Sequence, residues 1–184
     1  MDIYFLSSNK FKSAEVKKIL NSSHIRVISY DKKISEIQSD DMKEIVIDKV
    51  IKGFKEIGRP IIVEQTGLFI DEFGKLPGGL TQVFWDSPKA DKFSEYFSKG
   101  NASATAKTVI AFCDGKNIFT FEGETKGKIV SPPRGDRSFQ WDCVFEPNDY
   151  RETFAEMGEK KHKISMRRKA LDKLKKYLEE NKYE

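Results

Sequence analysis

Strand and helix patterns alternate along the N-terminal third of the chain, and this order limits the fold more than any other feature. Short apolar runs predict three strands, at about 3–6, 25–30 and 61–64. Two longer segments with apolar residues at helical spacing separate these runs, and they follow the cap-type residues Asn9 and Asp41. The second helix is expected to end near Gly58. Alternation of this kind is typical of α/β proteins.

The rest of the chain predicts an antiparallel addition to this sheet. Two runs rich in β-branched and aromatic residues flank Asp114-Gly115, which is a strong hairpin signal. A later strand is expected at 141–145, and a last helix from about 164 to 178. No repeat or low-complexity linker appears, so we predict one α/β domain, residues 1–184. It has a mixed, twisted central sheet flanked by helices, with an antiparallel hairpin lobe.

Composition and charge exclude several other classes. Hydrophobic residues make up 38% of the chain and charged residues 34%, which suits a folded domain. No apolar run approaches the roughly 18 residues that cross a bilayer, and the first residues lack a secretory pattern, so a cytoplasmic protein is expected. The net charge of +4 suits an anionic ligand such as a nucleotide and is too small to indicate a nucleic-acid partner. Cys113 and Cys143 are expected to be packing thiols.

Four polar clusters lie beside the predicted strands, where open α/β sheets bind their ligands. Familiar motifs such as a P-loop, a dinucleotide fingerprint or a zinc-protease helix are absent. The first cluster, 7–12, offers hydroxyl, amide and ammonium groups at a helix N-terminus that suit a phosphate, although an ordinary cap with solvated lysines has the same pattern. The second, 64–67, places the Glu64 carboxylate at a strand end as a candidate Mg²⁺ ligand.

The other two clusters lie in the last third of the chain. The third, 133–142, contains an aromatic pair, Phe139 and Trp141, that suits a purine, followed by Asp142, which can accept from ring N–H groups. Buried core aromatics are the alternative interpretation of that pair. The fourth cluster, 161–168, is basic, and a solvated helix face is its alternative.

In this order the clusters resemble the motifs of the inosine triphosphate pyrophosphatase family, whose members split deaminated purine nucleoside triphosphates into monophosphate and pyrophosphate. The family's T-G-N-x-x-K resembles SSNKFK at 7–12, and its acid-plus-Thr/Ser motif resembles EQTGL at 64–68. Its F-G-[WY]-D-P-x-F, T-F-A-E-M and K-x-x-[IV]-S-H-R stretches resemble FQWDCVF, TFAEM and KHKISMR. The likeness covers nearly the whole chain and implies the family's fold, with a nucleotide cleft between two lobes.

The resemblance implies a role for each matching residue. Triphosphate binding is implied for Ser7, Asn9, Lys12 and Lys49. Contact with the base is implied for Phe139, Trp141, Asp142, Lys161, Ser165 and Arg167. The resemblance also implies Mg²⁺ as cofactor, with Glu36 and Glu64 as its ligands, and a homodimer.

The chain departs from the family pattern at positions that carry the chemistry. Gln65 stands where the resemblance implies the aspartate that activates water, and an amide can neither take the proton nor add charge to a Mg²⁺ site. Met166 replaces the histidine of S-H-R, and Gln82 replaces a lysine that faces phosphate in some relatives. Gln140 replaces a glycine and Cys143 a proline.

The chain thus retains the residues implied to bind nucleotide and departs from the family at positions implied in catalysis. This combination predicts a protein that binds ITP, dITP or XTP with weak or absent hydrolysis. Such a protein is expected to be a nucleotide sensor or a subunit that acts on a partner protein. Loss of a general base typically costs about 10²- to 10⁴-fold in rate. The alternative is an active Mg²⁺-dependent pyrophosphatase in which Glu64 compensates by holding metal hydroxide. A third hypothesis, a basic nucleic-acid-binding module at 161–176, is disfavoured because the same helix has a coherent apolar face.

Overall fold

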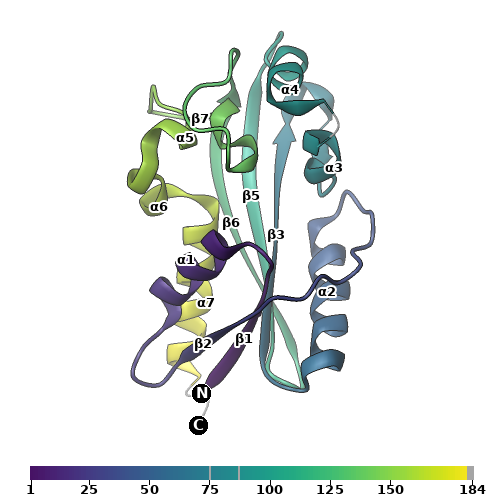
Figure 1. Ribbon diagram of the computed structural model, residues 1–184, viewed down its shortest axis with the longest axis vertical. Helices are drawn as coiled ribbons and strands as arrows, with labels where there is room; N and C mark the ends of the chain where they lie inside the picture. The colour runs from purple at the N-terminus through teal and green to yellow at the C-terminus, as the bar shows by residue number, and fades with distance from the viewer. Residues whose placement is uncertain (75, 87, 182–184) are drawn as a thin grey trace.

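A mixed sheet forms the centre of the computed structural model, which describes residues 1–74, 76–86 and 88–181 (Figure 1). Its strands are β1 (Asp2–Leu6), β2 (Arg26–Tyr30), β3 (Ile61–Ile70), β4 (Pro77–Gly78), β5 (Ser103–Cys113), β6 (Ile118–Ile129) and β7 (Phe145–Pro147). They lie in the order β2-β1-β3-β5-β6-β7, and β4 pairs with β3. β1 pairs in parallel with β2 and β3, and the remaining pairs are antiparallel.

Helices cover both faces of this sheet, which confirms the predicted mixed α/β class. They are α1 (Lys10–Leu20), α2 (Met42–Ile57), α3 (Thr81–Asp86), α4 (Lys89–Phe97), α5 (Phe154–Met157), α6 (Lys161–Ile164) and α7 (Met166–Glu180). Three short 3₁₀ helices are η1 (Asp71–Phe73), η2 (Gln140–Val144) and η3 (Gly158–Lys160). In Figure 1, α1 and α7 lie on one side of the sheet and α2 lies on the other. The helices that the structure describes are too short or too polar to cross a lipid bilayer.

Local sequence explains where the first two helices begin and end. Asn9 Oδ1 accepts a hydrogen bond from the backbone N–H of Lys12 at 3.1 Å, and Asp41 Oδ1 accepts from that of Lys43 at 2.7 Å. α2 ends at Gly58, whose φ of 63° is a left-handed conformation that glycine adopts without strain. The caps predicted from the sequence are therefore confirmed.

Alternating side chains in the central strands build a separate core on each face of the sheet. Ile62 in β3 and Ile110 in β5 pack with α1 and α7, whereas Val63 and Val109 pack with α2. Successive residues of a strand point to opposite faces, which explains this division. A third core, farther along the same strands, combines residues of α4, η2 and α5. The molecule thus has a lower lobe around α1, α2 and α7 and an upper lobe around α4, η2 and α5 (Figure 1).

Two predicted strands differ from the observed ones. The strand predicted at 61–64 continues to Ile70, so Glu64 lies within a 10-residue strand and not at its end. Antiparallel pairing with β5 runs the whole length of β3 and explains the extension. The strand predicted at 141–145 is wrong for most of its length, because η2 occupies 140–144 and β7 begins at Phe145.

The last predicted helix is two helices in the structure. Ser165 has an extended backbone, so α6 ends at Ile164 and α7 begins at Met166. The Ser165 hydroxyl oxygen accepts from the backbone N–H of Arg168 at 3.1 Å and caps α7. Leu171, Leu174 and Leu178 share the predicted apolar face and pack in the lower-lobe core, whereas Ile164 packs against the upper-lobe core.

Candidate functional site

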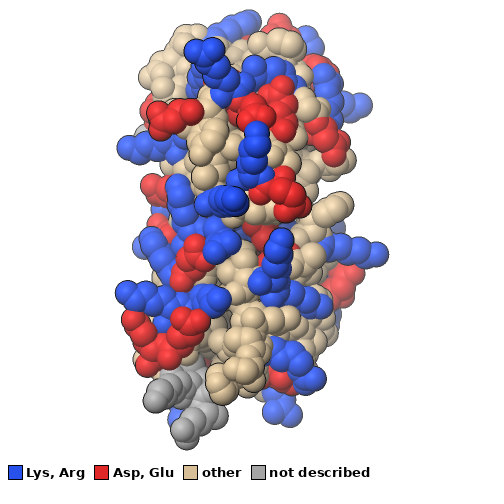
Figure 2. Space-filling model, turned by 90° about the vertical axis from the view of Figure 1, so that its left-hand side faces the viewer, with Lys and Arg blue, Asp and Glu red and all other residues tan. Residues whose placement is uncertain are grey.

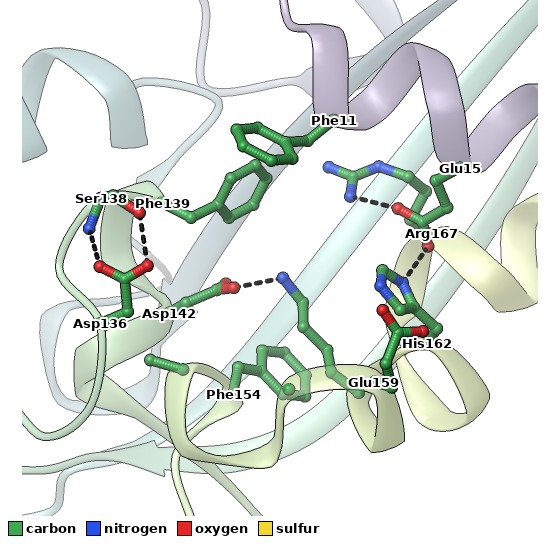
Figure 3. Close-up of a pocket in the computed structure, with 13 residues that line it drawn as sticks. Phe11, Glu15, Asp136, Ser138, Phe139, Asp142, Phe154, Glu159, His162 and Arg167 are labelled. Atoms are coloured by element: carbon green, nitrogen blue, oxygen red, sulfur yellow. Dashed lines mark hydrogen bonds and ion pairs between the residues drawn. The ribbon is translucent and has the colours of Figure 1, made fainter.

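A cavity of about 470 Å³ opens between the two lobes, at the N-terminal half of α1 (Figure 3). Its walls come from α1, the loop before η2, and the segment from η2 to α7. The labelled side chains are Phe11, Glu15, Asp136, Ser138, Phe139, Asp142, Phe154, Glu159, His162 and Arg167, and Lys161 also lines the cavity. The volume falls within the range of small-molecule sites, about 300 to 1,000 Å³.

Phenylalanine rings form an aromatic wall of this cavity. Phe139 and Phe11 meet edge to face with their centroids 6.2 Å apart. The ammonium of Lys161 lies 4.5 Å from the Phe139 centroid and 5.3 Å from that of Phe154. Aromatic side chains stack on nucleic-acid bases whatever the base, because every base has a π-face. The cavity therefore suits a flat aromatic ligand.

Trp141 does not line this cavity, which differs from the role implied by the family resemblance. The residue is 3% exposed and packs in the upper-lobe core, with its ring 5.9 Å from that of Phe145. In the turn of η2, Trp141 is buried in this core while Asp142 lines the cavity. The base-stacking role implied for Trp141 stays a prediction, and the rings that line the cavity in this structure are Phe139, Phe11 and Phe154.

Lys161 and Asp142 form a buried ion pair at the cavity. Burial raises the pKa of Asp142 and lowers the pKa of Lys161, and in each residue it outweighs the attraction of the partner. Removing one member of such a pair leaves an uncompensated buried charge. The two buried charges therefore compensate one another at the wall of the cavity.

Glu64 joins three elements through its ion pairs. Arg167 in α7 donates from Nε to both oxygens of Glu64, at 2.9 and 3.2 Å, and Lys12 Nζ in α1 lies 2.7 Å from Oε1. Arg167 also donates from Nη1 to Glu15 Oε2 at 3.0 Å. Burial by itself would raise the pKa of Glu64, but Arg167 and Lys12 outweigh it and lower the pKa to about 2. Glu64 is therefore a carboxylate with low proton affinity at neutral pH.

The first turn of α1 lies next to this network. Parallel pairing sets Phe5 opposite Ile62, so the chain that leaves β1 reaches Ser7 level with Glu64. Ser7 Oγ accepts from the backbone N–H of Asn9 at 3.2 Å, and Asn9 caps the helix. The structure thus brings the residues of the first polar cluster together at a helix N-terminus, where backbone N–H groups suit an anion.

Gln65 points away from Glu64, because neighbouring residues of a strand face opposite sides. Its amide Nε2 donates to the backbone carbonyl of Gly79 at 3.4 Å. Lys49, in α2, forms an ion pair with Glu36. The Glu64 side chain therefore faces α1 and α7, and the Gln65 side chain faces the opposite side of β3.

The predicted Mg²⁺ ligands Glu36 and Glu64 do not form a metal site with their neighbours. Glu36 is paired with Lys49, and both oxygens of Glu64 accept from Arg167 or Lys12. Among the residues that the structure describes, no group of three or more His, Cys, Asp or Glu side chains is arranged to hold a metal ion. Hard cations need several free oxygen ligands, so this donor set does not fit a resident Mg²⁺.

The residues that depart from the family pattern have structural roles of their own. Met166 is buried in the upper-lobe core. Gln140 and Gln82 form a side-chain hydrogen bond at 2.6 Å. Gln140 has φ of 46°, a left-handed backbone that costs a residue with a side chain about 1 to 2 kcal/mol and suits the glycine it replaces. Cys143 and Cys113 are buried free thiols, as expected.

The sequence analysis assigned no role to Phe11, Glu15 or His162, although Phe11 and His162 fall within the first and fourth polar clusters. Phe11 and Glu15 stand at i and i+4 in α1, so they share one face of the helix. His162 Nδ1 lies 3.1 Å from Glu15 Oε1, which joins α6 to α1. The i, i+4 spacing could have placed Phe11 and Glu15 on one helix face, whereas the KHKISMR stretch contains His162 only at an unspecified position of the family pattern.

A cavity between two lobes of a mixed α/β fold is typical of small-molecule-binding domains. The chain belongs to the Ham1 family, whose model matches residues 3–177. It is similar to the inosine triphosphate pyrophosphatase of Yarrowia lipolytica, with 37% identity over 184 residues, 98% of this chain and 97% of the relative. It is also similar to the dITP/XTP pyrophosphatase of Methanopyrus kandleri, with 34% identity over 184 residues and 98% of each chain. The resemblance seen in the sequence is therefore confirmed.

Solved structures agree with this assignment of the fold. A HAM1 protein from Coxiella burnetii matches with a TM-score of 0.86 and 25% identity, over 98% of this chain and 99% of that one. The Ham1 protein of Staphylococcus aureus matches with a TM-score of 0.83 and 23% identity, over 98% of this chain and all of that one. The fold expected from the resemblance is therefore confirmed.

Proposed function

We propose that this protein binds deaminated purine nucleoside triphosphates, of the ITP, dITP or XTP type, in the cavity between its lobes and hydrolyses them slowly or not at all. Two of its relatives are named for pyrophosphatase activity on inosine triphosphate or on dITP and XTP. The observation that carries the second part of the proposal is the amide of Gln65, where the family resemblance implies a carboxylate. A protein of this kind acts as a nucleotide sensor or as a subunit that responds to nucleotide.

The triphosphate is assigned to the first turn of α1. Free backbone N–H groups and the helix dipole favour an anion at this end of a helix. Lys12 adds a positive charge that is largely buried beside Glu64. Burial lowers the pKa of Lys12, against the opposing effect of Glu64, and a bound phosphate favours the charged form. Phosphate binding and protonation of Lys12 therefore support one another.

The purine is assigned to the cavity beside Phe139. Lys161 and Arg167 line that cavity and carry N–H donors without acceptors, so they suit an oxygen at purine position six. The guanidinium of Arg167 has five N–H groups, and its bonds to Glu64 and Glu15 leave others for a ligand. An amino group at position six leaves such donors unpaired, at a cost of about 1 to 3 kcal/mol each.

Slow hydrolysis follows from the chemistry of residues 64 and 65. An attacking water needs a base whose pKa lies near the working pH. The amide of Gln65 cannot accept the proton. Burial alone would raise the pKa of Glu64, but Arg167 and Lys12 lower it to about 2, so Glu64 has too little proton affinity to replace the base. The ion pairs of Glu64 therefore disfavour the hypothesis that Glu64 replaces the missing general base.

The charge distribution favours a small anionic ligand over a nucleic acid. Figure 2 shows Lys and Arg side chains interspersed with Asp and Glu over the face that carries α1 and α7. Several basic residues of α7 already have partners: Arg168 lies 2.8 Å from Asp172, and Lys173 donates to the carbonyl of Glu122 at 2.7 Å. A continuous basic surface, the usual footprint of a nucleic-acid-binding protein, is not what this face presents.

Pyrophosphate release and binding, measured side by side, test the proposal. The intact protein is incubated with the Mg²⁺ salts of ITP, dITP, XTP and ATP, and calorimetry records the dissociation constant of each. We expect saturable binding of the deaminated nucleotides with pyrophosphate release that is slow or undetectable. Release at the rate of an ordinary enzyme, with a median turnover of about 10 per second, would favour the second candidate, an active pyrophosphatase.

That second candidate is supported by the names of the relatives and by the retained Glu64. Four further features remain predictions: a homodimer, an effector protein as partner, a cytoplasmic location and dependence on Mg²⁺. Size-exclusion chromatography with light scattering tests the first of these directly. The rate and affinity measurements with and without Mg²⁺ test the last.

A further inference from the structure

His162 lines the cavity at a position that the family pattern leaves unspecified. It occupies the first x of K-x-x-[IV]-S-H-R, between Lys161 and the cap residue Ser165. Its side chain is 42% exposed, and Figure 3 shows it facing the same cavity as Phe139 and Arg167. The histidine that the family has in S-H-R is absent here, so His162 is the histidine of this site.

Glu15 determines how the imidazole ring is presented. His162 Nδ1 lies 3.1 Å from Glu15 Oε1, and a carboxylate only accepts, so Nδ1 carries a proton and donates. The other nitrogen, Nε2, makes no hydrogen bond within the part of the chain that the structure describes. Nε2 is therefore an acceptor while the ring is neutral and a donor once the ring is protonated.

The same carboxylate also positions Arg167. Glu15 Oε2 accepts from Arg167 Nη1 at 3.0 Å while Oε1 bonds to His162. Two nitrogen-bearing side chains from α6 and α7 are thus held by one residue of α1, along one wall of the cavity (Figure 3). Met166, which stands at the family's histidine position, is buried in the upper-lobe core and offers no donor to the cavity.

We propose that His162 contacts position six of the bound purine and sets base selectivity through its own protonation state. The protonated ring donates from Nε2 to the six-position oxygen of hypoxanthine and repels an amino group there. The neutral ring presents a lone pair, which accepts from the six-amino group of adenine and faces the hypoxanthine oxygen unfavourably. Preference for the deaminated purine is therefore strong at acidic pH and weakens as pH rises. The inference rests on the nucleotide binding proposed above.

Charged groups from each element around the cavity line the space that His162 faces. They are Glu15 (α1), Asp136 (loop before η2), Asp142 (η2), Glu159 (η3), Lys161 (α6) and Arg167 (α7). Histidine changes charge between about pH 5 and 8, outside the ordinary range of these other groups. Burial moves the pKa values of Asp142 and Lys161 toward that interval, so the experiment must separate them from His162.

The experiment compares dissociation constants for ITP and ATP at about pH 5.5 and about pH 8 in three proteins. They are the unmodified chain, His162→Asn, whose amide can donate or accept at every pH, and His24→Asn. The chain has two histidines, so His24→Asn is the matched control for loss of a histidine elsewhere. The terminal phosphate titrates alike in both nucleotides, and its effect cancels in the ratio of the two constants.

We expect the ratio of the ATP dissociation constant to the ITP dissociation constant to fall about tenfold from the lower to the higher pH in the unmodified chain and in His24→Asn. A tenfold change corresponds to the contribution of about one hydrogen bond. In His162→Asn the ratio should stay constant. A constant ratio in the unmodified chain, or an equal fall in His162→Asn, would overturn the inference and leave nucleotide binding standing. Failure to bind either nucleotide would overturn the proposed function with it. Because His162 is partly exposed, matching unfolding curves are expected for all three proteins.

Discussion

Arg167 Nε lies 2.9 Å from Glu64 Oε2, which joins the first turn of α7 to the middle of β3 across 103 positions of the chain. Both side chains are buried. Burying two charges is costly, so such a pair adds little net stability compared with apolar residues, but removal of one partner leaves the other charge uncompensated. The pair therefore makes the stability of the domain sensitive to either residue.

Glu64→Gln is expected to lower the free energy of unfolding by about 3 kcal/mol at pH 7. The native pKa of about 2 lies below the ordinary value of 4.5, so the carboxylate stabilises the fold above that ordinary value, and this contribution is lost as pH falls toward about 2. Urea unfolding at about pH 7 and about pH 3 measures the difference. The exposed Glu159→Gln serves as a control with little effect, and an equal loss at both pH values would contradict the depressed pKa.

Gln65→Asp is expected to raise the rate of pyrophosphate release from dITP at least about a hundredfold, because it supplies a general base. Gln65→Asn, which changes the length of the side chain in the same way without adding a proton acceptor, should leave the rate unchanged. Steady-state release in the presence of Mg²⁺ measures both. Equal rates in the unmodified chain and Gln65→Asp would remove residue 65 from the base position. A partial gain would call for joint reversion of Met166 and Gln82.

Lys12→Ala is expected to weaken ITP binding by about tenfold or more and to leave inosine binding nearly unchanged, because an ammonium at a helix N-terminus acts on phosphate. Lys10→Ala is the matched control, since Lys10 lies in the same turn of α1 and is exposed. Calorimetry with ITP and inosine gives the four comparisons. Similar losses for ITP and inosine would place Lys12 away from the phosphates.

Phe139→Ala is expected to weaken ITP and ATP binding to a similar extent, by about 1 to 3 kcal/mol, because stacking does not distinguish bases. Trp141→Ala should act differently and lower the free energy of unfolding by about 3 to 5 kcal/mol, since Trp141 is a core residue. Calorimetry and urea unfolding of both variants separate the two roles. A stable Trp141→Ala protein that has lost nucleotide affinity would return the stacking role to Trp141.

Much of the fold could be predicted from the sequence because it depends on local signals. The caps Asn9 and Asp41 and the hairpin at Asp114-Gly115 act within a few residues, so propensity and spacing identify them. The interruption at Ser165 was harder to anticipate, because the apolar spacing of the last helix continues across it. It becomes evident only from the structure, where Ile164 and Met166 pack on the upper-lobe core and the later apolar residues of α7 pack on the lower one.

The candidate site was less accessible from the sequence, since its geometry depends on contacts between distant segments. The resemblance supplied Phe139, Asp142, Lys161 and Arg167, all of which line the cavity. It could not show that Trp141 is buried, because the 3₁₀ turn of η2 determines which side chains lie in the core and which line the cavity. The pairing of Glu15 with His162 likewise depends on the packing of α1 against α6, which no local pattern expresses.

Glu64 and Gln65 are adjacent in β3 and point to opposite faces of the sheet, so each can change in evolution without disturbing the contacts of the other. A change at residue 65 leaves untouched the ion pairs that Glu64 makes on the other face of the sheet. Under the proposed function, selection can abolish or restore turnover at one codon while the ion pairs of Glu64 persist. Recognition and turnover are then separate heritable traits, and a lineage can exchange one for the other without refolding the domain.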